Sequence, residues 1–222
     1  MNISTEILNL PKEISYFVER LRFIRASLTN NDETLNGMLR ESFSSLSNAV
    51  NGKNVALVGN ARSLCSSRNG DAIDANDIVI RINRAPKFSL ESHGDKTDWL
   101  ALATSIDREH FKALNCDKLI WMSHKRKRLK FWMKKETLYL FPLELYAEIK
   151  TKLGAPPSTG LMMLFWLSTQ SFASLTVYGF DFFASLSLTG SRTANQVPHD
   201  FNAEYEWFQE FVSARENVVL VK

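Results

Sequence analysis

Short runs of apolar residues, separated by polar segments, recur along the chain from residue 54 onward. Continuous Val, Ile and Leu runs of this length are typical of strands that are covered on both faces, as in a parallel sheet. They predict strands at Val55–Val58, Ile78–Ile82, Trp99–Ala103, Leu119–Met122, Thr137–Phe141, Leu175–Tyr178 and Val218–Val221. The segments between them predict helices near Asp107–Leu114, Leu143–Lys152, Thr159–Ser171 and Asp200–Arg215.

This alternation predicts an α/β fold with a single, doubly wound, mostly parallel sheet of about seven strands. In such sheets ligands bind beyond the carboxyl ends of the strands. Asn60, Asn83 and Phe180 fall at such strand ends, whereas Ser158–Gly160 opens a helix.

Residues 1–52 have a different, helical pattern. One apolar stripe at helical spacing consists of Ile14, Phe17, Val18, Leu21 and Ile24. Asn31 and Asp32 are suited to cap a second helix, which would run through Leu35, Met38, Leu39 and Phe43. Because Asn51-Gly52 is a turn signal, we predict a helical N-terminal extension over residues 1–52, packed on an α/β domain over residues 53–222. The alternative is a helix pair that binds a partner or a membrane surface.

Composition narrows the class only slightly. The 222 residues are 45% hydrophobic and 23% charged, with a net charge of +3, which is too small to indicate nucleic-acid binding. Cys65 and Cys116 are too few for a disulfide scaffold or a zinc site, and reduced thiols are the rule in the cytosol. We see no signal peptide and no apolar run of about 18 residues, so we expect no transmembrane helix.

One stretch is strongly basic, Lys125–Lys130 followed by Lys134 and Lys135, with Trp121, Phe131 and Trp132 around it. A solvated helix face is one interpretation. The other is contact of residues 125–135 with an acidic acceptor or with anionic lipid headgroups at a membrane surface.

Two short segments could hold a phosphate. Gly59-Asn60 follows a strand, where glycine permits a tight turn and close approach of a ligand, but neither G-x-G-x-x-G nor a Walker A loop is present. Ser158, Thr159 and Gly160 start a helix, where free N–H groups attract an anion, although Ser158 also suits plain capping. Asn83 offers two donors and an acceptor for a ribose or phosphate, or a cap for its own strand.

His199 is the best candidate for a general base. An imidazole near its usual pKa accepts a proton from a hydroxyl at neutral pH, and Glu204, in the following helix, could orient or polarise it. Arg81 and Arg84 could have a structural role, by pairing with Asp74, Asp77 or Asp98 within the fold. No Asp-x-Asp pair occurs, so we expect no metal and no other cofactor.

Taken together, these segments resemble the animal-type sialyltransferase family, which uses CMP-linked sugars. Its large motif matches Val55–Asn60, Ile73–Pro86 and Gly94–Thr97; its small motif matches Pro157–Gly160 with Tyr178–Phe180; its very small motif matches His199 and Glu204. The resemblance covers about 150 residues from Asn54 onward and leaves the first 50 outside.

The resemblance implies an inverting, metal-independent transfer on a variant glycosyltransferase A-type, Rossmann-like fold. Asn60 and Asn83 would hold the phosphate and ribose of CMP. Gly59, Ser158, Thr159, Gly160, Gly179 and Phe180 would line the donor pocket. His199, with Glu204, would take the proton of the acceptor hydroxyl.

Three departures from the family stand out. Its paired cysteines are replaced by Val55 and Phe172, which should meet in the core, and its membrane anchor is missing. Both departures favour a cytoplasmic, bacterial-type relative, either free or peripheral to the inner face of a membrane. The family's phosphate-contacting histidine has no clear counterpart, and Arg192 is the candidate to replace it.

We therefore expect a glycosyltransferase that moves sialic acid, or a related keto-sugar acid such as Kdo, from its CMP-sugar to a hydroxyl of a glycan or glycolipid in polysaccharide biosynthesis. The alternative is a non-catalytic protein that binds nucleotide-sugars on a decayed transferase scaffold.

Overall fold

The computed structural model describes residues 11–182 and 198–221, and these form an α/β fold around one seven-stranded sheet. All neighbouring strands are parallel, in the order β5-β4-β3-β2-β1-β6-β7. The strands are β1 (Asn54–Val58), β2 (Ile78–Ile82), β3 (Trp99–Leu102), β4 (Lys118–Trp121), β5 (Leu138–Leu140), β6 (Ser174–Tyr178) and β7 (Val218–Val221). The predicted α/β class and the seven strands are confirmed. The apolar runs of β1 to β5 are almost fully buried, as expected for strands covered on both faces, whereas the outer strand β7 exposes Val219.

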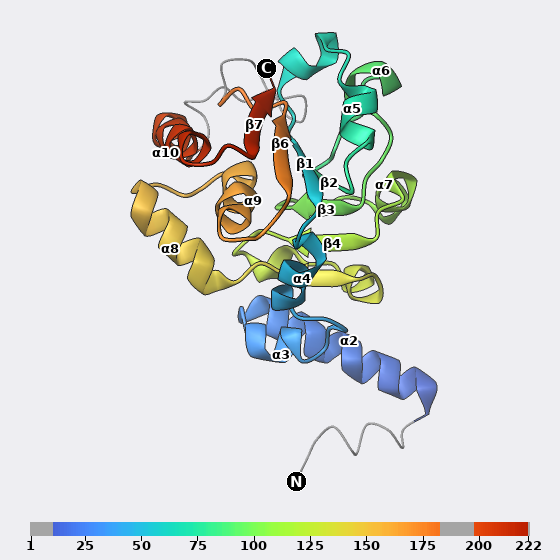
Figure 1. Ribbon diagram of the computed structural model, residues 1–222. Helices are drawn as coiled ribbons and strands as arrows, with labels where there is room; N and C mark the ends of the chain where they lie inside the picture. The colour runs from blue at the N-terminus through green and yellow to red at the C-terminus, as the bar shows by residue number, and fades with distance from the viewer. Residues whose placement is uncertain (1–10, 183–197, 222) are drawn as a thin grey trace.

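Helices cover both faces of the sheet (Figure 1). On one side lie α5 (Gly70–Asp74), α6 (Leu90–His93) and α7 (Arg108–Leu114); on the other lie α8 (Leu143–Leu153), α9 (Thr159–Ser168) and α10 (Phe201–Ser213). Short 3₁₀ turns, η3 (Arg62–Ser66), η4 (Arg126–Arg128) and η5 (Phe131–Lys135), complete this part. Helix α9 is apolar all round and is buried from Gly160 to Leu167, so it forms the centre of the larger core.

The strand order reverses at the middle of the sheet. Strands β2 to β5 extend from one side of β1, and the chain then crosses back to place β6 on the other side of β1. Ligands of doubly wound proteins bind at such a switch point, beyond the carboxyl ends of the strands. The ends of β1 and β6, at Val58 and Tyr178, are paired in register there.

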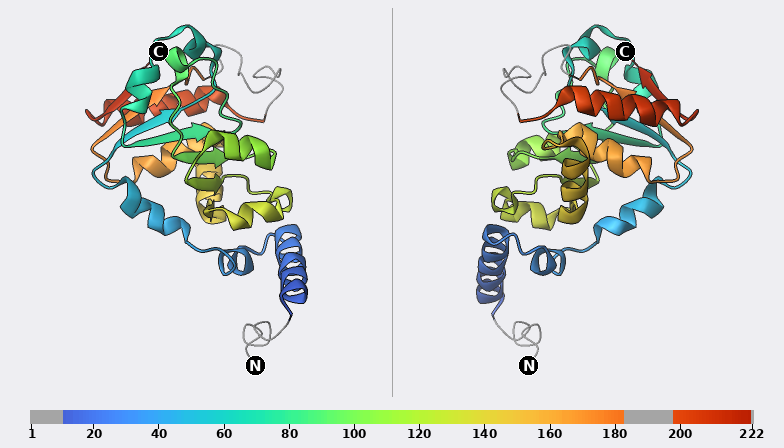
Figure 2. Two further views of the ribbon diagram at one scale, coloured as in Figure 1. Left: turned by 90° about the vertical axis from the view of Figure 1, so that its right-hand side faces the viewer. Right: turned by 90° about the vertical axis from the view of Figure 1, so that its left-hand side faces the viewer.

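Helices α2 and α3 contact each other at one end of the molecule, and the chain then leads through α4 into β1 (Figures 1 and 2). These N-terminal helices are α2 (Lys12–Leu28), α3 (Asp32–Asn36) and α4 (Leu46–Val50), with the 3₁₀ turn η2 (Phe43–Ser45) before α4. Helix α2 does not use the apolar stripe of the sequence to pack on the domain, since Ile14, Phe17, Leu21 and Ile24 are exposed. It packs through Phe23, Ala26 and Ser27, and Phe23 meets Phe131 edge-to-face with ring centroids 5.4 Å apart.

A continuous second helix through Phe43 is also wrong. Asn31 does cap α3 by accepting a hydrogen bond from Thr34 N at 2.8 Å, but the helix ends at Asn36, before Gly37. Ser42 and Ser45 then use their hydroxyls locally, in bonds to Ser44 Oγ, Glu41 and the Ser42 carbonyl. Such local bonds compete with a helix and favour turns.

The basic stretch is solvated only in part, and it forms two short 3₁₀ turns and no α-helix. Arg126 is completely buried and forms a bidentate pair with Asp32, at 2.8 and 2.6 Å, while donating to the carbonyls of Ser123 and Phe141. Lys134 Nζ lies 2.5 Å from Glu19 of α2. Part of this charge therefore attaches the N-terminal helices to the sheet.

Val55 and Phe172, which stand where the family has paired cysteines, are both buried in the same hydrophobic cluster. Hydrophobic burial thus joins the two motifs here. Cys65 and Cys116 are free thiols, and burial raises the pKa of Cys116 to about 12. Within residues 11–182 and 198–221, no helix combines the length and apolar character needed to span a bilayer.

Candidate active site

Two glycines bring the ends of β1 and β6 into direct contact. Gly59 N donates to the Tyr178 carbonyl at 2.8 Å, and Ala61 N donates to the Gly179 carbonyl at 3.1 Å. A Cβ at Gly59 would collide with the Gly179 carbonyl oxygen and the Phe180 ring, and Gly179 has a φ of 64°. The sequence predicted that glycine here allows a phosphate to approach closely. In this fold the two glycines also allow the two loops to pack closely against each other.

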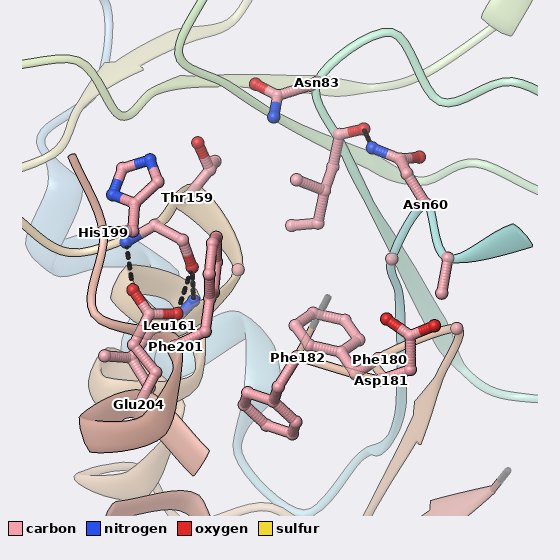
Figure 3. Close-up of a pocket in the computed structure, with 16 residues that line it drawn as sticks. Asn60, Asn83, Thr159, Leu161, Phe180, Asp181, Phe182, His199, Phe201 and Glu204 are labelled. Carbon is pink, nitrogen blue, oxygen red and sulfur yellow. Dashed lines mark hydrogen bonds between the residues drawn. The ribbon is translucent and has the colours of Figure 1, made fainter. Parts of the chain in front are cut away.

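A pocket of about 220 Å³ opens at this switch point. Its lining includes ten residues that the sequence nominated: Gly59, Asn60, Asn83, Ser158, Thr159, Gly160, Gly179, Phe180, His199 and Glu204. Figure 3 shows several of these side chains converging from the ends of β1, β2 and β6 and from α9 and α10.

Asn60 and Asn83 lie on one rim of the pocket (Figure 3). Asn60 Nδ2 donates to the Ile82 carbonyl at 3.0 Å, and within the described residues its amide oxygen is left for a ligand. Asn83 Oδ1 accepts from Ala103 N at 3.0 Å, which leaves its NH₂ group. Asn83 has a φ of 55°, a left-handed conformation that asparagine adopts more readily than most residues.

Ser158 caps α9, and its hydroxyl accepts from Leu161 N at 3.2 Å. Ser158 N and Oγ also donate to the two carboxylate oxygens of Glu204, each at 2.6 Å. The Glu204 carboxylate thus already occupies part of the predicted anion site. Within residues 11–182 and 198–221, the N–H groups of Thr159 and Gly160 are the ones left at this helix start for a ligand.

Glu204 is only 2% exposed, although it can carry a charge. Burial raises the pKa of Glu204 to about 7, against the opposing effect of the two bonds from Ser158. Asp200 caps α10 by accepting hydrogen bonds from the N–H groups of Asn202 and Ala203. This cap places Glu204 in the first turn of α10, where its side chain reaches Ser158. Glu204 therefore connects the starts of α9 and α10.

His199 is oriented by a backbone carbonyl. Its Nδ1 lies 2.8 Å from the Pro156 carbonyl oxygen, which only accepts, so Nδ1 carries the proton and Nε2 keeps its lone pair. Burial lowers the pKa of His199 below its ordinary value, and the bond to Pro156 opposes this shift. Glu204 was expected to orient His199; its hydrogen bonds instead go to Ser158, and Pro156 has the orienting role.

Six lining residues were not nominated from the sequence: Ala61, Ile82, Leu161, Asp181, Phe182 and Phe201. Asp181 and Phe182 directly follow the β6 end, and Phe201 contacts His199 with ring centroids 5.7 Å apart. Their closeness in sequence to the nominated residues was the one feature from which they could have been predicted. Arg192, the candidate for a phosphate contact, lies outside the described residues.

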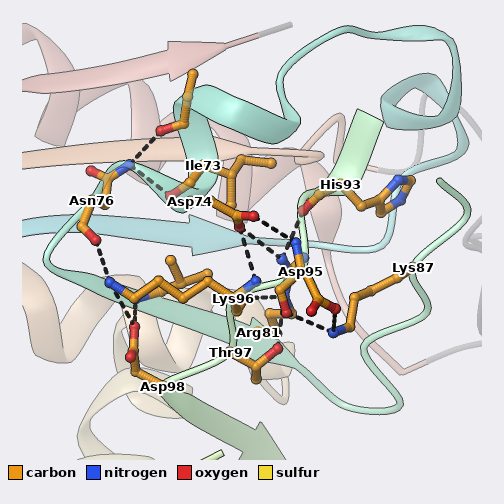
Figure 4. A network of polar contacts seen from close by, with 12 residues as sticks. Ile73, Asp74, Asn76, Arg81, Lys87, His93, Asp95, Lys96, Thr97 and Asp98 are labelled. Carbon is orange, nitrogen blue, oxygen red and sulfur yellow. Dashed lines mark hydrogen bonds and ion pairs between the residues drawn. The ribbon is translucent and has the colours of Figure 1, made fainter. Parts of the chain in front are cut away.

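Arg81 and Arg84 are not part of the pocket lining. Arg81 is buried in the network of Figure 4, where it donates to the carbonyls of Lys96 and His93 and lies 3.9 Å from Asp74. Burial lowers the pKa of Arg81 to about 10. The predicted structural pairing with Asp74 is therefore correct. Among the described residues, no group of three or more His, Cys, Asp and Glu is arranged to hold a metal ion.

A doubly wound parallel sheet, with a histidine acceptor and a helix start at its switch point, is an arrangement in which α/β proteins bind nucleotides and can position a general base. The chain belongs to glycosyltransferase family 29 (sialyltransferase), whose model matches residues 3–145. The match includes the N-terminal residues, which were expected to lie outside it. The protein is therefore a sialyltransferase-family glycosyltransferase with a CMP-sugar donor, in a family whose enzymes need no metal.

Two solved structures share this fold. A mammalian sialyltransferase in complex with Gal-beta-1-3GalNAc-ortho-nitrophenol aligns at a TM-score of 0.66 and 20% identity, covering 97% of this chain and 88% of that one. A second mammalian sialyltransferase structure aligns at a TM-score of 0.61 and 21% identity, covering 77% and 69%. No curated protein matches the sequence.

Proposed function

We propose that this enzyme transfers sialic acid from CMP-sialic acid, with inversion, to a hydroxyl of a galactoside on a glycan or glycolipid. Family membership supports the donor class. The acceptor class is suggested by the similar mammalian structure, which holds a galactoside.

The observation that carries the mechanism is the bond from His199 Nδ1 to the Pro156 carbonyl. It leaves Nε2 as the proton acceptor in the pocket. In the proposed step, Nε2 takes the acceptor O–H proton while that oxygen attacks the anomeric carbon. The bond from the anomeric carbon to the phosphate oxygen breaks, and CMP leaves with its electron pair.

Binding of the donor would use the groups that internal bonds leave for a ligand. Thr159 and Gly160 offer backbone N–H groups at the start of α9, which suit the phosphate or the sugar carboxylate. Asn60 offers its amide oxygen and Asn83 its NH₂ group, on the opposite rim. We assign Ser158 and Glu204 to holding this helix start, and Gly59, Gly179 and Phe180 to shaping the pocket wall.

We further propose that residues 1–52 are a helical extension and that residues 53–222 carry catalysis, since all pocket-lining residues belong to the second range. Val55 and Phe172 remove any need for an oxidising compartment at that position, and this supports a cytoplasmic, bacterial-type enzyme. Activity should then be unchanged by dithiothreitol.

CMP release from CMP-sialic acid and from CMP-Kdo, with and without lactose as acceptor and in the presence of EDTA, tests the function. We expect acceptor-stimulated release from CMP-sialic acid that survives EDTA. If CMP is released from CMP-Kdo and not from CMP-sialic acid, then the donor is CMP-Kdo. Tight CMP binding without release from either donor would favour a non-catalytic binding protein.

A further inference from the structure

Helix α2 turns an apolar stripe outward. Ile14, Phe17, Leu21, Ile24 and Leu28 follow each other at intervals of three and four residues, so they share one face of the helix. Their exposed fractions run from 40% at Ile24 to 67% at Leu28. The opposite face, with Phe23 and Ala26, is the one that packs on the body of the protein. The stripe is therefore not needed to attach the helix.

Cationic side chains border this stripe on both sides. Arg20 neighbours Phe17 and Ile24 on the helix surface, and Arg25 neighbours Leu21 and Leu28. Both arginines, and Arg22 beside them, are exposed. Of the acidic residues of the region, Glu19 and Asp32 are already paired with Lys134 and Arg126, and Glu13 is exposed in the first turn of α2.

The exposed remainder of the basic stretch adds charge beside α2. Turn η4 packs against this helix, and the side chains of Lys125, Lys127, Arg128 and Lys130 are exposed, in contrast to the buried Arg126. The end of the molecule that carries α2 thus combines an apolar stripe with a cationic border, and the helix projects from the body (Figure 2).

We propose that α2 lies on the surface of an anionic membrane, with the stripe inserted among the acyl chains and the arginines against lipid phosphates. A helix with apolar and basic faces of this kind binds in the plane of the interface, and each basic residue near an anionic surface adds to the affinity. This proposal does not depend on the sugar donor, because α2 contributes no residue to the pocket.

A second copy of the chain is a weaker candidate for this surface. The stripe covers only two heptads, whereas stable coiled coils sustain the pattern over three or four. A parallel pair would also place Arg20 of one helix opposite Arg25 of the other, at positions where natural pairs place opposite charges.

Sedimentation of the 222-residue chain with vesicles tests the proposal. Vesicles of phosphatidylcholine alone are compared with vesicles that also contain phosphatidylglycerol. We expect binding to the anionic vesicles only. The double variant Phe17→Ser/Leu21→Ser should lose at least about tenfold in affinity, and Arg20→Gln/Arg25→Gln roughly 30-fold at low salt.

The matched control is Phe88→Ser/Leu90→Ser, which removes two residues that are 71% and 68% exposed elsewhere on the surface. It should bind vesicles like the wild type. None of the three double variants should change the melting temperature or CMP release with lactose. Equal binding by the wild type and the stripe variant, or no binding by the wild type, would overturn the proposal. The proposal would also be overturned if the wild type is a dimer in sedimentation equilibrium, the stripe variant is a monomer, and neither binds vesicles.

Discussion

The pocket at the ends of β1 and β6 and the η4 turn that holds the N-terminal helices each contain a buried ionisable side chain, and they use it differently. In the pocket, Glu204 holds the start of α9 next to the proposed base. At the other end of the molecule, Arg126 attaches Asp32 and its helices to the sheet. The comparison suggests that one buried charge serves chemistry and stability together, whereas the other serves stability alone.

Replacement of His199 should give the largest effect, and on activity only. We expect His199→Ala to lower kcat by about 10²–10⁴-fold, because general-base assistance is lost. The urea midpoint should change little, since the ring is only half-buried. His110→Ala is the control, as His110 bonds the Arg84 carbonyl outside the pocket. Equal kcat values for the two variants would remove His199 from the mechanism.

Replacement of Arg126 should affect stability without affecting the pocket. Breaking a buried ion pair typically costs about 3–5 kcal/mol, and we expect Arg126→Met to fall near the lower limit because the Asp32 side chain remains 21% exposed. Urea unfolding measures this loss, while kcat per folded molecule should stay unchanged. Lys127→Met, at an exposed neighbour, should lie within about 0.5 kcal/mol of the wild type. A similar loss in both variants would argue against a role of the buried pair.

Replacement of Glu204 should give the smallest effect, and it should depend on pH. The pKa of Glu204 is raised from 4.5 to about 7 in the folded state. Between these values the folded protein binds more protons than the unfolded chain, so the stability from this group falls as pH rises from about 4.5 to 7.

The lowered pKa of His199 acts in the opposite direction, with stability rising as pH approaches 6.5. The difference between wild type and Glu204→Gln isolates the carboxyl. The free energy of unfolding of the wild type should decline relative to the variant across pH 4.5 to 7, by an amount on the order of 2 kcal/mol. Glu206→Gln, on the exposed side of α10, should run parallel to the wild type. Parallel curves for Glu204→Gln would mean that this carboxyl is ionised throughout.

Much of the sheet and the pocket lining could be predicted from the sequence, because strand ends of a parallel sheet must meet at one edge. The apolar runs located the seven strands, and the residues after β1, β2 and β6 then had to converge. Partners within the pocket could not be predicted in this way. Glu204 and Ser158 are 46 residues apart, and only their packing shows that the carboxylate reaches Ser158 and not His199.

The N-terminal region shows where sequence patterns mislead. An apolar stripe normally faces the core, but α2 packs through Phe23 on the opposite side. The sequence did not predict the burial of Arg126 either. A run of basic residues suggests a solvated surface, and the pattern does not show whether one of them pairs with a carboxylate inside the protein. Long-range contacts, such as that from Arg126 to Asp32, decide both cases.

The pairing of Asp32 with Arg126 also has a consequence for biosynthesis. The two residues are 94 positions apart, which at a ribosomal rate of about 5–20 residues per second corresponds to roughly 5–20 s of translation. Helices α2 and α3 emerge first, yet their docking site on η4 and the Phe141 carbonyl is completed much later. During that interval both apolar faces of α2 are available to chaperones or to a lipid surface.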